Sequence, residues 1–197
     1  GGRTLTPRGN WEQTCWNSDE DVDYLELEIA LSEHVRLERQ ILLARKDRLM
    51  LLADVVLRDE TGATNGRADA ANGAPDAHHG KPESLEYHGT LPLGDDVAFD
   101  AAGETREGYL VGRKPRAVVF PLALPEWRSE MCGGSLETTA ENLELRQART
   151  SARRMYVPLL FDLDTKRILR PATWRTLTVA ENRVIQPADV AVGYRVQ

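Results

Sequence analysis

The chain has few cysteines, no long apolar run and no excess of basic residues, and each of these features excludes a class of protein. Its two cysteines, Cys15 and Cys132, are too few for a disulfide framework, so free or buried thiols are expected rather than a bridge. No apolar run approaches the roughly 20 residues of a membrane helix, so no membrane partner is expected. The net charge of −6 argues against binding to nucleic acid, which needs a basic surface.

The motifs of common catalytic and cofactor sites are also missing. The sequence contains no P-loop, no GxGxxG and no Gly-x-Ser-x-Gly. Its histidines, His34, His78, His79 and His88, include no His-x-His or His-x₃-His pair, so a closed zinc site is not expected. We therefore expect no catalytic residue, no metal ligand and no cofactor within this chain.

What is present is the composition of an ordinary globular protein. The 197 residues are 41% hydrophobic and 28% charged, which suits one all-β domain or two small ones. The chain opens on Gly1-Gly2 and stops at Val196-Gln197 within a strand-like pattern. We expect one β-sandwich domain over 1–197, excised from a longer chain, so the missing targeting signals say nothing about the parent.

Alternating apolar residues predict the first strands. Leu25, Leu27, Ile29 and Leu31 share one face of an extended chain. The segment 35–57 leaves no polar face on a helical wheel, whereas as a hairpin turning at 45–48 it places its apolar residues in register. Its second strand is apolar on both faces and is expected to be central in the sheet.

Further strand-like runs continue to the end of the chain. Their spacing, with Pro, Gly or Asp at most breaks, predicts an all-β fold, an antiparallel, supersandwich-like β-sandwich with little helix. Residues 58–84 are turn formers and predict a mobile surface loop. Residues 137–154 contain a helical capping box, Thr138-x-x-Glu141, but their alternation favours a strand. The runs are Leu85–Leu91, Val97–Ala101, Glu107–Val111, Ala117–Leu124, Leu143–Ala148, Met155–Leu163, Trp174–Ala180 and Asp189–Val196.

An acidic stretch begins the first predicted strand. Asp19-x-Asp21-x-Asp23 has the spacing that opens an EF-hand loop, but the glycine and the distal glutamate of that motif are absent. The aspartates share their parity with Leu25, so they must lie beyond the edge of the core or before a bulge. We interpret the stretch as a solvated strand entrance that binds no divalent cation tightly.

The tryptophans are the candidates for carbohydrate binding, because an indole can stack on a sugar ring. They are Trp11, Trp16, Trp127 and Trp174. Trp174 is flanked by strand residues and is expected in the core. Trp127 follows two prolines in PLALPEW and is the best exposed candidate, so it is the predicted carbohydrate-binding residue.

Two long stretches resemble a known family. The run CWNSDEDVDYLELEIALSEHVRLERQILLARKDRLMLLADVVL and the closing stretch YVPLLFDLDTKRILRPATWRTLTVAENRVIQPADVAVGYRVQ are similar to the β-sandwich part of heparinase II/III-type polysaccharide lyases. The resemblance implies an upstream α/α-toroid domain, with the lyase machinery where toroid and sandwich meet. It also implies Tyr and His as base and acid, an acidic polysaccharide as partner, and a periplasmic or extracellular location.

The family's zinc is not carried over, because some members bind it through a His-x-His pair that this sequence lacks. Nor is there a position onto which the catalytic His can be carried. The expected function is an accessory β-sandwich domain of a lyase-like, carbohydrate-related protein, not catalytic alone although its parent is implied to be a lyase. The alternative is a free-standing carbohydrate-binding or cation-assisted interaction module.

Overall fold

The computed structural model describes residues 4–58, 84–139, 141–150 and 153–197, and every helix or strand element within them is a β-strand. All pairings between these strands are antiparallel. The all-β fold class predicted from the sequence is confirmed. The strands are β1 Arg8–Ser18, β2 Val22–Ala30, β3 Val35–Ala44, β4 Leu49–Arg58, β5 Ser84–Pro92, β6 Ala98–Ala101, β7 Gly108–Val111, β8 Pro115–Pro121, β9 Gly134–Thr139, β10 Asn142–Thr150, β11 Arg154–Asp162, β12 Trp174–Leu177, β13 Ala180–Glu181, β14 Val184–Ile185 and β15 Gly193–Val196.

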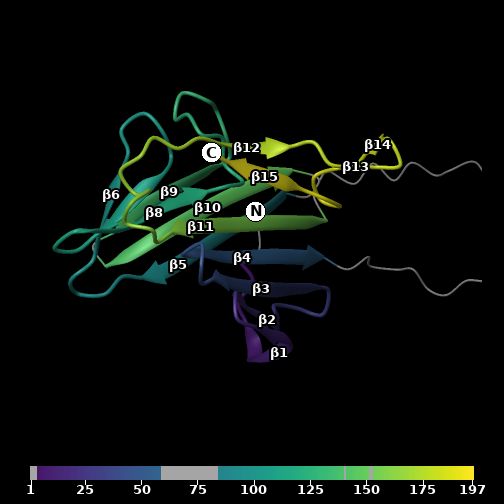
Figure 1. The fold of residues 1–197 in the computed structure, drawn as a ribbon. Helices are drawn as coiled ribbons and strands as arrows, with labels where there is room; N and C mark the ends of the chain where they lie inside the picture. The colour runs from purple at the N-terminus through teal and green to yellow at the C-terminus, as the bar shows by residue number, and fades with distance from the viewer. Residues whose placement is uncertain (1–3, 59–83, 140, 151–152) are drawn as a thin grey trace, which may run out of the picture.

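Two sheets make up most of the fold. The larger has eight strands in the order β1-β2-β3-β4-β11-β8-β7-β6, and the smaller has three in the order β5-β10-β9. Two short ribbons, β12-β15 and β13-β14, complete the described strands. Figure 1 shows β1 to β4 side by side at the lower edge of the view, with β12 and β15 on the other side of β11.

The main core lies between the two sheets. The large sheet contributes alternate residues of β11, such as Met155, Val157 and Leu159, and the small sheet contributes Leu136, Leu143 and Leu145. On the opposite face of the large sheet, a second cluster forms where Trp174 of β12 covers Phe120 of β8. The period of two along each strand therefore puts apolar side chains into both cores.

The first predicted hairpin and the strand beside it are confirmed. Strands β2, β3 and β4 are neighbours in register, with Leu25 opposite Ile41 and Ile41 opposite Leu52. Strand β4 lies inside the sheet between β3 and β11, as its two apolar faces predicted.

The capping box at Thr138 does not start a helix, because residues on both sides of it are strand residues. Leu143 and Leu145 point into the main core, while β10 is hydrogen-bonded to β5 on one side and to β9 on the other. The preference for a strand in this segment is confirmed.

Some boundaries differ from the predicted ones, and three strands, β1, β9 and β14, were missed. Strand β1 shows no burial alternation, since all its residues are exposed, and its register shifts between Arg8/Glu12 and Gln13/Cys15. Strand β9 was not predicted, because the segment that follows it has a helical composition. The predicted run Trp174–Ala180 is divided into β12 and β13, and the run Asp189–Val196 is extended only from Gly193.

Other expectations concern single groups or the chain as a whole. Cys15 and Cys132 are both free and exposed, as expected. No helix among the described residues is long and apolar enough to cross a membrane. The predicted loop over 58–84 has its residues 59–83 outside the described part of the chain.

Candidate functional site

Trp127 lies at the rim of a cleft, which we call the Trp127 cleft. Its side chain is 46% exposed, and the cleft beside it has a volume of about 280 Å³. Val118 and Phe120 of β8 contribute the apolar part of its lining. The full lining is Thr105, Glu107, Tyr109, Val118, Phe120, Glu126, Trp127, Arg170, Pro171, Ala172 and Thr173.

A buried arginine holds the segment that carries Trp127. Arg106 is 8% exposed, and its guanidinium donates hydrogen bonds to the carbonyl oxygens of Pro125 (2.9 Å), Trp127 and Glu130 (2.6 Å). The backbone amide of Arg106 also donates to the carbonyl of Glu126 at 2.9 Å. One side chain thus bonds three carbonyl groups of the loop, of which that of Trp127 also accepts from the Glu130 amide at 3.1 Å, and it holds the backbone of the segment that carries the indole.

Three side chains follow one another along the wall below Trp127. Thr105, Glu107 and Tyr109 all line the cleft, whereas the Arg106 side chain reaches the loop carbonyls. Thr105 pairs with Trp127 in an isolated antiparallel bridge. The entry into β7 is therefore placed against the indole by backbone contacts on both sides of Arg106.

The polar groups of this wall are partly unsatisfied. The Thr105 hydroxyl donates to Glu107 Oε1 at 2.7 Å. The other carboxylate oxygen, Glu107 Oε2, is buried and has no hydrogen-bond partner among the described residues. Burial raises the pKa of the Tyr109 phenol, and the negative charges of Glu107 and Asp100 raise it further. The Tyr109 phenol is therefore protonated at neutral pH and can donate a hydrogen bond in the cleft.

The opposite wall, Arg170 to Thr173, is held against the floor by the residue that follows it. Trp174 is 3% exposed, packs edge-to-face on Phe120 with ring centroids 5.5 Å apart, and donates its indole N–H to the carbonyl of Leu124 at 3.0 Å. Both the floor and the Trp127 segment are thereby tied to the start of β12.

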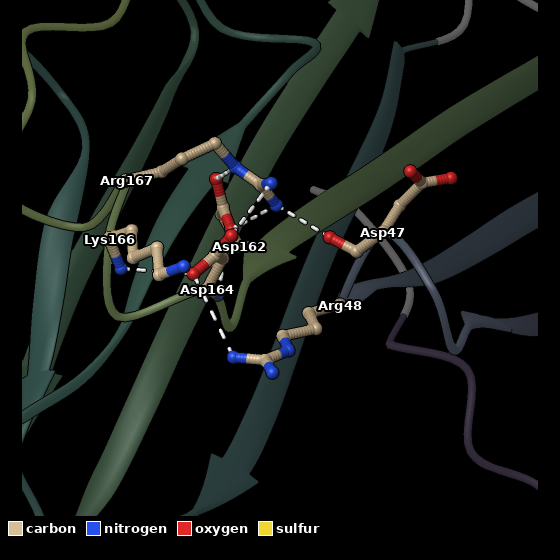
Figure 2. A network of polar contacts seen from close by, with 6 residues as sticks. All are labelled: Asp47, Arg48, Asp162, Asp164, Lys166 and Arg167. Atoms are coloured by element: carbon tan, nitrogen blue, oxygen red, sulfur yellow. Dashed lines mark hydrogen bonds and ion pairs between the residues drawn. The ribbon is translucent and has the colours of Figure 1, made fainter.

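A network of ion pairs anchors the segment that leads into this wall (Figure 2). The Arg167 guanidinium donates through Nε and Nη2 to the two carboxylate oxygens of Asp162, each at 2.8 Å, and through Nη1 to Asp164 at 3.0 Å. Arg167 also donates to the carbonyl of Asp47 in the β3–β4 turn. The Lys166 backbone amide and the neighbouring guanidinium groups hold the pKa of the Asp164 carboxyl below its usual value. The network fixes the chain four residues before Pro171.

The other tryptophans lie elsewhere. Trp174 is in the core, as the sequence predicted. Trp16 is more exposed than Trp127, at 56%, but it lies on the fully exposed edge strand β1 and lines neither the Trp127 cleft nor the cavity beside Arg39. Trp11 stacks over the Arg39 guanidinium, with 5.1 Å between the carbon of the cation and the ring centroid. Trp127 alone among them combines exposure with a cleft.

Arg39 belongs to a second polar cluster, in which Asp54 is buried and Arg39 is partly exposed. Its Nε and Nη2 donate to the two oxygens of Asp54, each at 2.8 Å, and the Tyr87 hydroxyl donates to Asp54 Oδ2 at 2.6 Å. The hydrogen bond with Asp54 raises the pKa of Arg39, and burial, with the charge of Asp54, raises that of Tyr87. The adjoining cavity of about 20 Å³ has room for about one water molecule. This cluster joins β3 and β4 to β5 and is structural.

The acidic stretch lies in the β1–β2 turn and the start of β2, where basic residues of the β3–β4 turn contact it. Arg45 pairs with Asp23, and Lys46 pairs with Asp21. Asp19 accepts hydrogen bonds from the backbone amides of Asp21 and of the residue after it, each at 2.7 Å. The parity of the aspartates placed them at an edge, but no sequence pattern pointed to these cationic partners.

The histidines do not gather at any site in the described part of the chain. His34 is exposed, and His88 Nε2 lies 3.1 Å from a Glu144 carboxylate oxygen on the small sheet. His78 and His79 lie outside the described residues. Within 4–58, 84–139, 141–150 and 153–197, no three His, Cys, Asp or Glu side chains are grouped so as to hold a metal ion.

Comparison with known proteins gives a similarity of fold. No protein-family model matches the chain, and no curated protein matches it. Among solved structures, heparan sulfate lyase HepC from Pedobacter heparinus is similar at 11% identity over 86% of this chain and 24% of the lyase, with a TM-score of 0.47. A mutant of HepC aligns over 95% and 28%, at 10% identity and a TM-score of 0.48. A heparinase III gene product aligns over 95% and 27%, at 8% identity and a TM-score of 0.42.

These values concern the fold alone. The chain spans about a quarter of the length of these lyases, so their activity is not transferred to it by the alignment. The expected resemblance to heparinase II/III-type lyases is confirmed at the level of the fold.

Proposed function

We propose that this chain is an accessory, carbohydrate-binding β-sandwich domain of a lyase-like protein, and that it binds a glycan through the Trp127 cleft without catalysing a reaction alone. The observation that carries the proposal is the presentation of Trp127. Trp127 is 46% exposed beside the cleft, its segment is held there by a buried arginine that makes several backbone contacts, and an indole face can stack on a sugar ring.

The chemistry of the cleft suits a sugar. An indole face covers the C–H groups on one side of a pyranose ring, while carboxylate, hydroxyl and guanidinium groups exchange hydrogen bonds with its hydroxyls. The lining supplies Trp127 for the first role, and Glu107, Glu126, Thr105 and Arg170 for the second. This mixture of one apolar surface and a few directional polar groups is typical of small-ligand sites.

The accessory role rests on the sequence resemblance, which implies that lyase chemistry needs an upstream helical domain. The partners proposed on the same ground are that helical domain and an acidic polysaccharide. Reading the parent gene tests the first directly, because a helical domain encoded upstream favours the accessory role and its absence favours a free-standing binding module.

Glycan binding is tested by calorimetric titration of the chain with oligosaccharides, using Trp127→Ala and, as a matched control, Trp16→Ala. Loss of the stacking surface should weaken binding by about tenfold or more, whereas the exposed Trp16 on β1 should be dispensable. Equal affinities of wild type and Trp127→Ala would refute the proposal. A rise in ultraviolet absorbance from an unsaturated uronate product would refute the non-catalytic role.

A further inference from the structure

The large sheet extends beyond the small sheet that packs on its inner face. The small sheet has three strands against eight in the large one, and its edge strand β5 lies over β3 and β4, where Tyr87 bonds to Asp54 beside Arg39. Strands β1 and β2 lie further out, and β1 is the last strand on that side. Figure 1 shows β1 and β2 at the lower edge of the molecule, beyond β4. The inner face of these outer strands therefore projects past the layer that covers the rest of the sheet.

The projecting part of the inner face is apolar. Leu25 of β2 lies opposite Trp16 of β1 and Ile41 of β3, so these three side chains share the face. Trp11 stacks over the Arg39 guanidinium, which lies on the same face. Trp16 is 56% exposed and Trp11 37%, and the aliphatic side chains beside them are only partly buried and belong to neither core cluster of the described chain. We call this surface the β1–β3 overhang; it consists of Trp11, Trp16, Leu25, Leu27, Ile41 and Leu43.

We propose that the β1–β3 overhang is the contact surface of a two-fold symmetric dimer, in which the overhang of a second copy of this chain packs face to face on it. The large sheet and the small sheet end in a step, and a step of this kind is complementary to itself. In a two-fold arrangement the projecting strands of each copy occupy the layer that the other copy lacks, so that both inner faces are covered as in a sandwich. The inference goes beyond the proposed function: the Trp127 cleft is lined by Phe120, which packs on the opposite face of the large sheet, so the dimer leaves the cleft open.

The distribution of charge favours a second copy on this face. The charged side chains that β2 and β3 place on the inner face, Asp23 and Arg39, are each paired within one copy, with Arg45 and Asp54. Two copies therefore meet there without like charges facing each other. The outer face of the same strands carries four carboxylates, those of Glu12, Glu26, Glu28 and Glu38. Two chains of net charge −6 that met through the outer face would repel each other, so the overhang is the face that suits self-association.

The size of the overhang sets the expected affinity. Strands β1, β2 and β3 have nine to eleven residues, and the overhang takes in the first two strands and the second half of the third. At a spacing of about 4.8 Å between strands, this gives roughly 400 Å² on each copy and about 800 Å² for the pair. That area is at the low end for specific complexes. The register shifts in β1 also disfavour a hydrogen-bonded ladder with another edge, so the contact is made by side chains, and we expect a Kd on the order of 10–100 μM.

The test is sedimentation equilibrium of the whole chain over a dilution series from about 1 μM to about 1 mM, which brackets the expected Kd. The average mass should rise from that of one chain to that of two and stop there, because a two-fold contact is closed. Trp16→Ala removes an exposed indole from the contact without touching the core, and should weaken association by about tenfold. The same variant should leave the calorimetric titration with oligosaccharides unchanged, since Trp16 lies outside the Trp127 cleft.

Two neighbouring leucines of β3 provide a matched pair of variants. Leu43 lies on the overhang, opposite Asp23, and Leu42 lies on the outer face, opposite Tyr24; both are partly buried. Leu43→Glu places one carboxylate from each copy in the contact and should weaken association by more than about tenfold. Leu42→Glu makes the same change in size and charge on the outer face and should leave the Kd unchanged. Thermal melting checks that each variant is folded, and Trp16→Ala decides the matter should Leu43→Glu not fold.

The outcomes decide between the overhang and every other occupant or contact. A wild-type chain that stays monomeric throughout the series would overturn the inference and leave that face to another partner. A dimer that is unchanged in Trp16→Ala and in Leu43→Glu would place the contact elsewhere, and an average mass that rises beyond two chains would contradict a closed contact. Equal weakening in Leu43→Glu and Leu42→Glu would assign the effect to overall charge, which also overturns the inference. None of these results bears on glycan binding at Trp127.

Discussion

Replacing Arg106 with alanine should loosen the segment that presents Trp127 and destabilise the fold. The guanidinium is 8% exposed and donates to the carbonyls of Pro125, Trp127 and Glu130. No other side chain among the described residues donates to these three carbonyls in the structure. Loss of these hydrogen bonds should therefore lower both the free energy of unfolding and the affinity of the cleft for a glycan.

The size of the destabilisation depends on how many of these carbonyls water can reach in the Arg106→Ala variant. A hydrogen bond from a charged donor contributes about 1.5–3 kcal/mol net. Trp127 and Glu130 are exposed, so their carbonyls are rehydrated in the variant and only part of the interaction is lost. We expect a loss of about 3 kcal/mol in the free energy of unfolding, which for a chain of this size lowers Tm by about 6–12 °C.

The control is Arg128→Ala. Arg128 is exposed and donates through one nitrogen, Nε, to the carbonyls of Ala102 and Thr105 at 3.0 and 2.7 Å. Its loss should cost about 1 kcal/mol or less. Urea unfolding and calorimetric melting measure both variants. If Arg106→Ala is no more destabilising than Arg128→Ala, the role assigned to Arg106 is wrong.

Three further outcomes follow from the polar contacts. Tyr87→Phe removes a donor to the buried Asp54 and should cost about 1–2 kcal/mol, less than Asp54→Ala, which leaves a cation uncompensated; urea unfolding in which Tyr87→Phe costs as much would contradict this. Burial raises the pKa of Tyr194 to about 12, above the value near 10 of an unfolded tyrosine, so stability that is complete below pH ~10 should decline as pH rises towards 12; a Tyr194→Phe variant with an undiminished decline would contradict this. Calcium should bind the acidic stretch no tighter than about millimolar, since Arg45 already pairs with it; a micromolar site abolished by Asp21→Asn would contradict that.

Local periodicity was enough to predict the part of the fold where each strand has one buried face. Leu25 and Ile41 share a face with other apolar residues of their strands, and from that periodicity the sequence predicted β2, β3 and β4 as adjoining strands, whereas their register comes from the structure. Strand β1 could not be found in this way. It is an edge strand with no buried face, so its hydrogen bonds to β2 leave no trace in the hydrophobic pattern.

The Trp127 cleft could be predicted only in part, for a related reason. The prolines before Trp127 indicated that it leaves the sheet, and hence that it is exposed. Glu107 and Arg170 come from loops far apart in sequence, and only the order of β7, β8 and β11 in the large sheet brings those loops together. A buried arginine that serves backbone carbonyls, such as Arg106, has no sequence signature of its own.

The most direct test of carbohydrate binding at Trp127 is an amide and indole nuclear magnetic resonance titration with the oligosaccharides used for the calorimetric titration. Each of the four tryptophans gives one indole N–H signal, so the four signals report on four places in the same sample. Trp174 is buried and its N–H is bonded to Leu124, and Trp11 is stacked on Arg39. The account predicts a saturable shift of the Trp127 signal with the signals of Trp11, Trp16 and Trp174 little changed. A shift confined to Trp16 or Trp11, or none at saturating glycan, would contradict it.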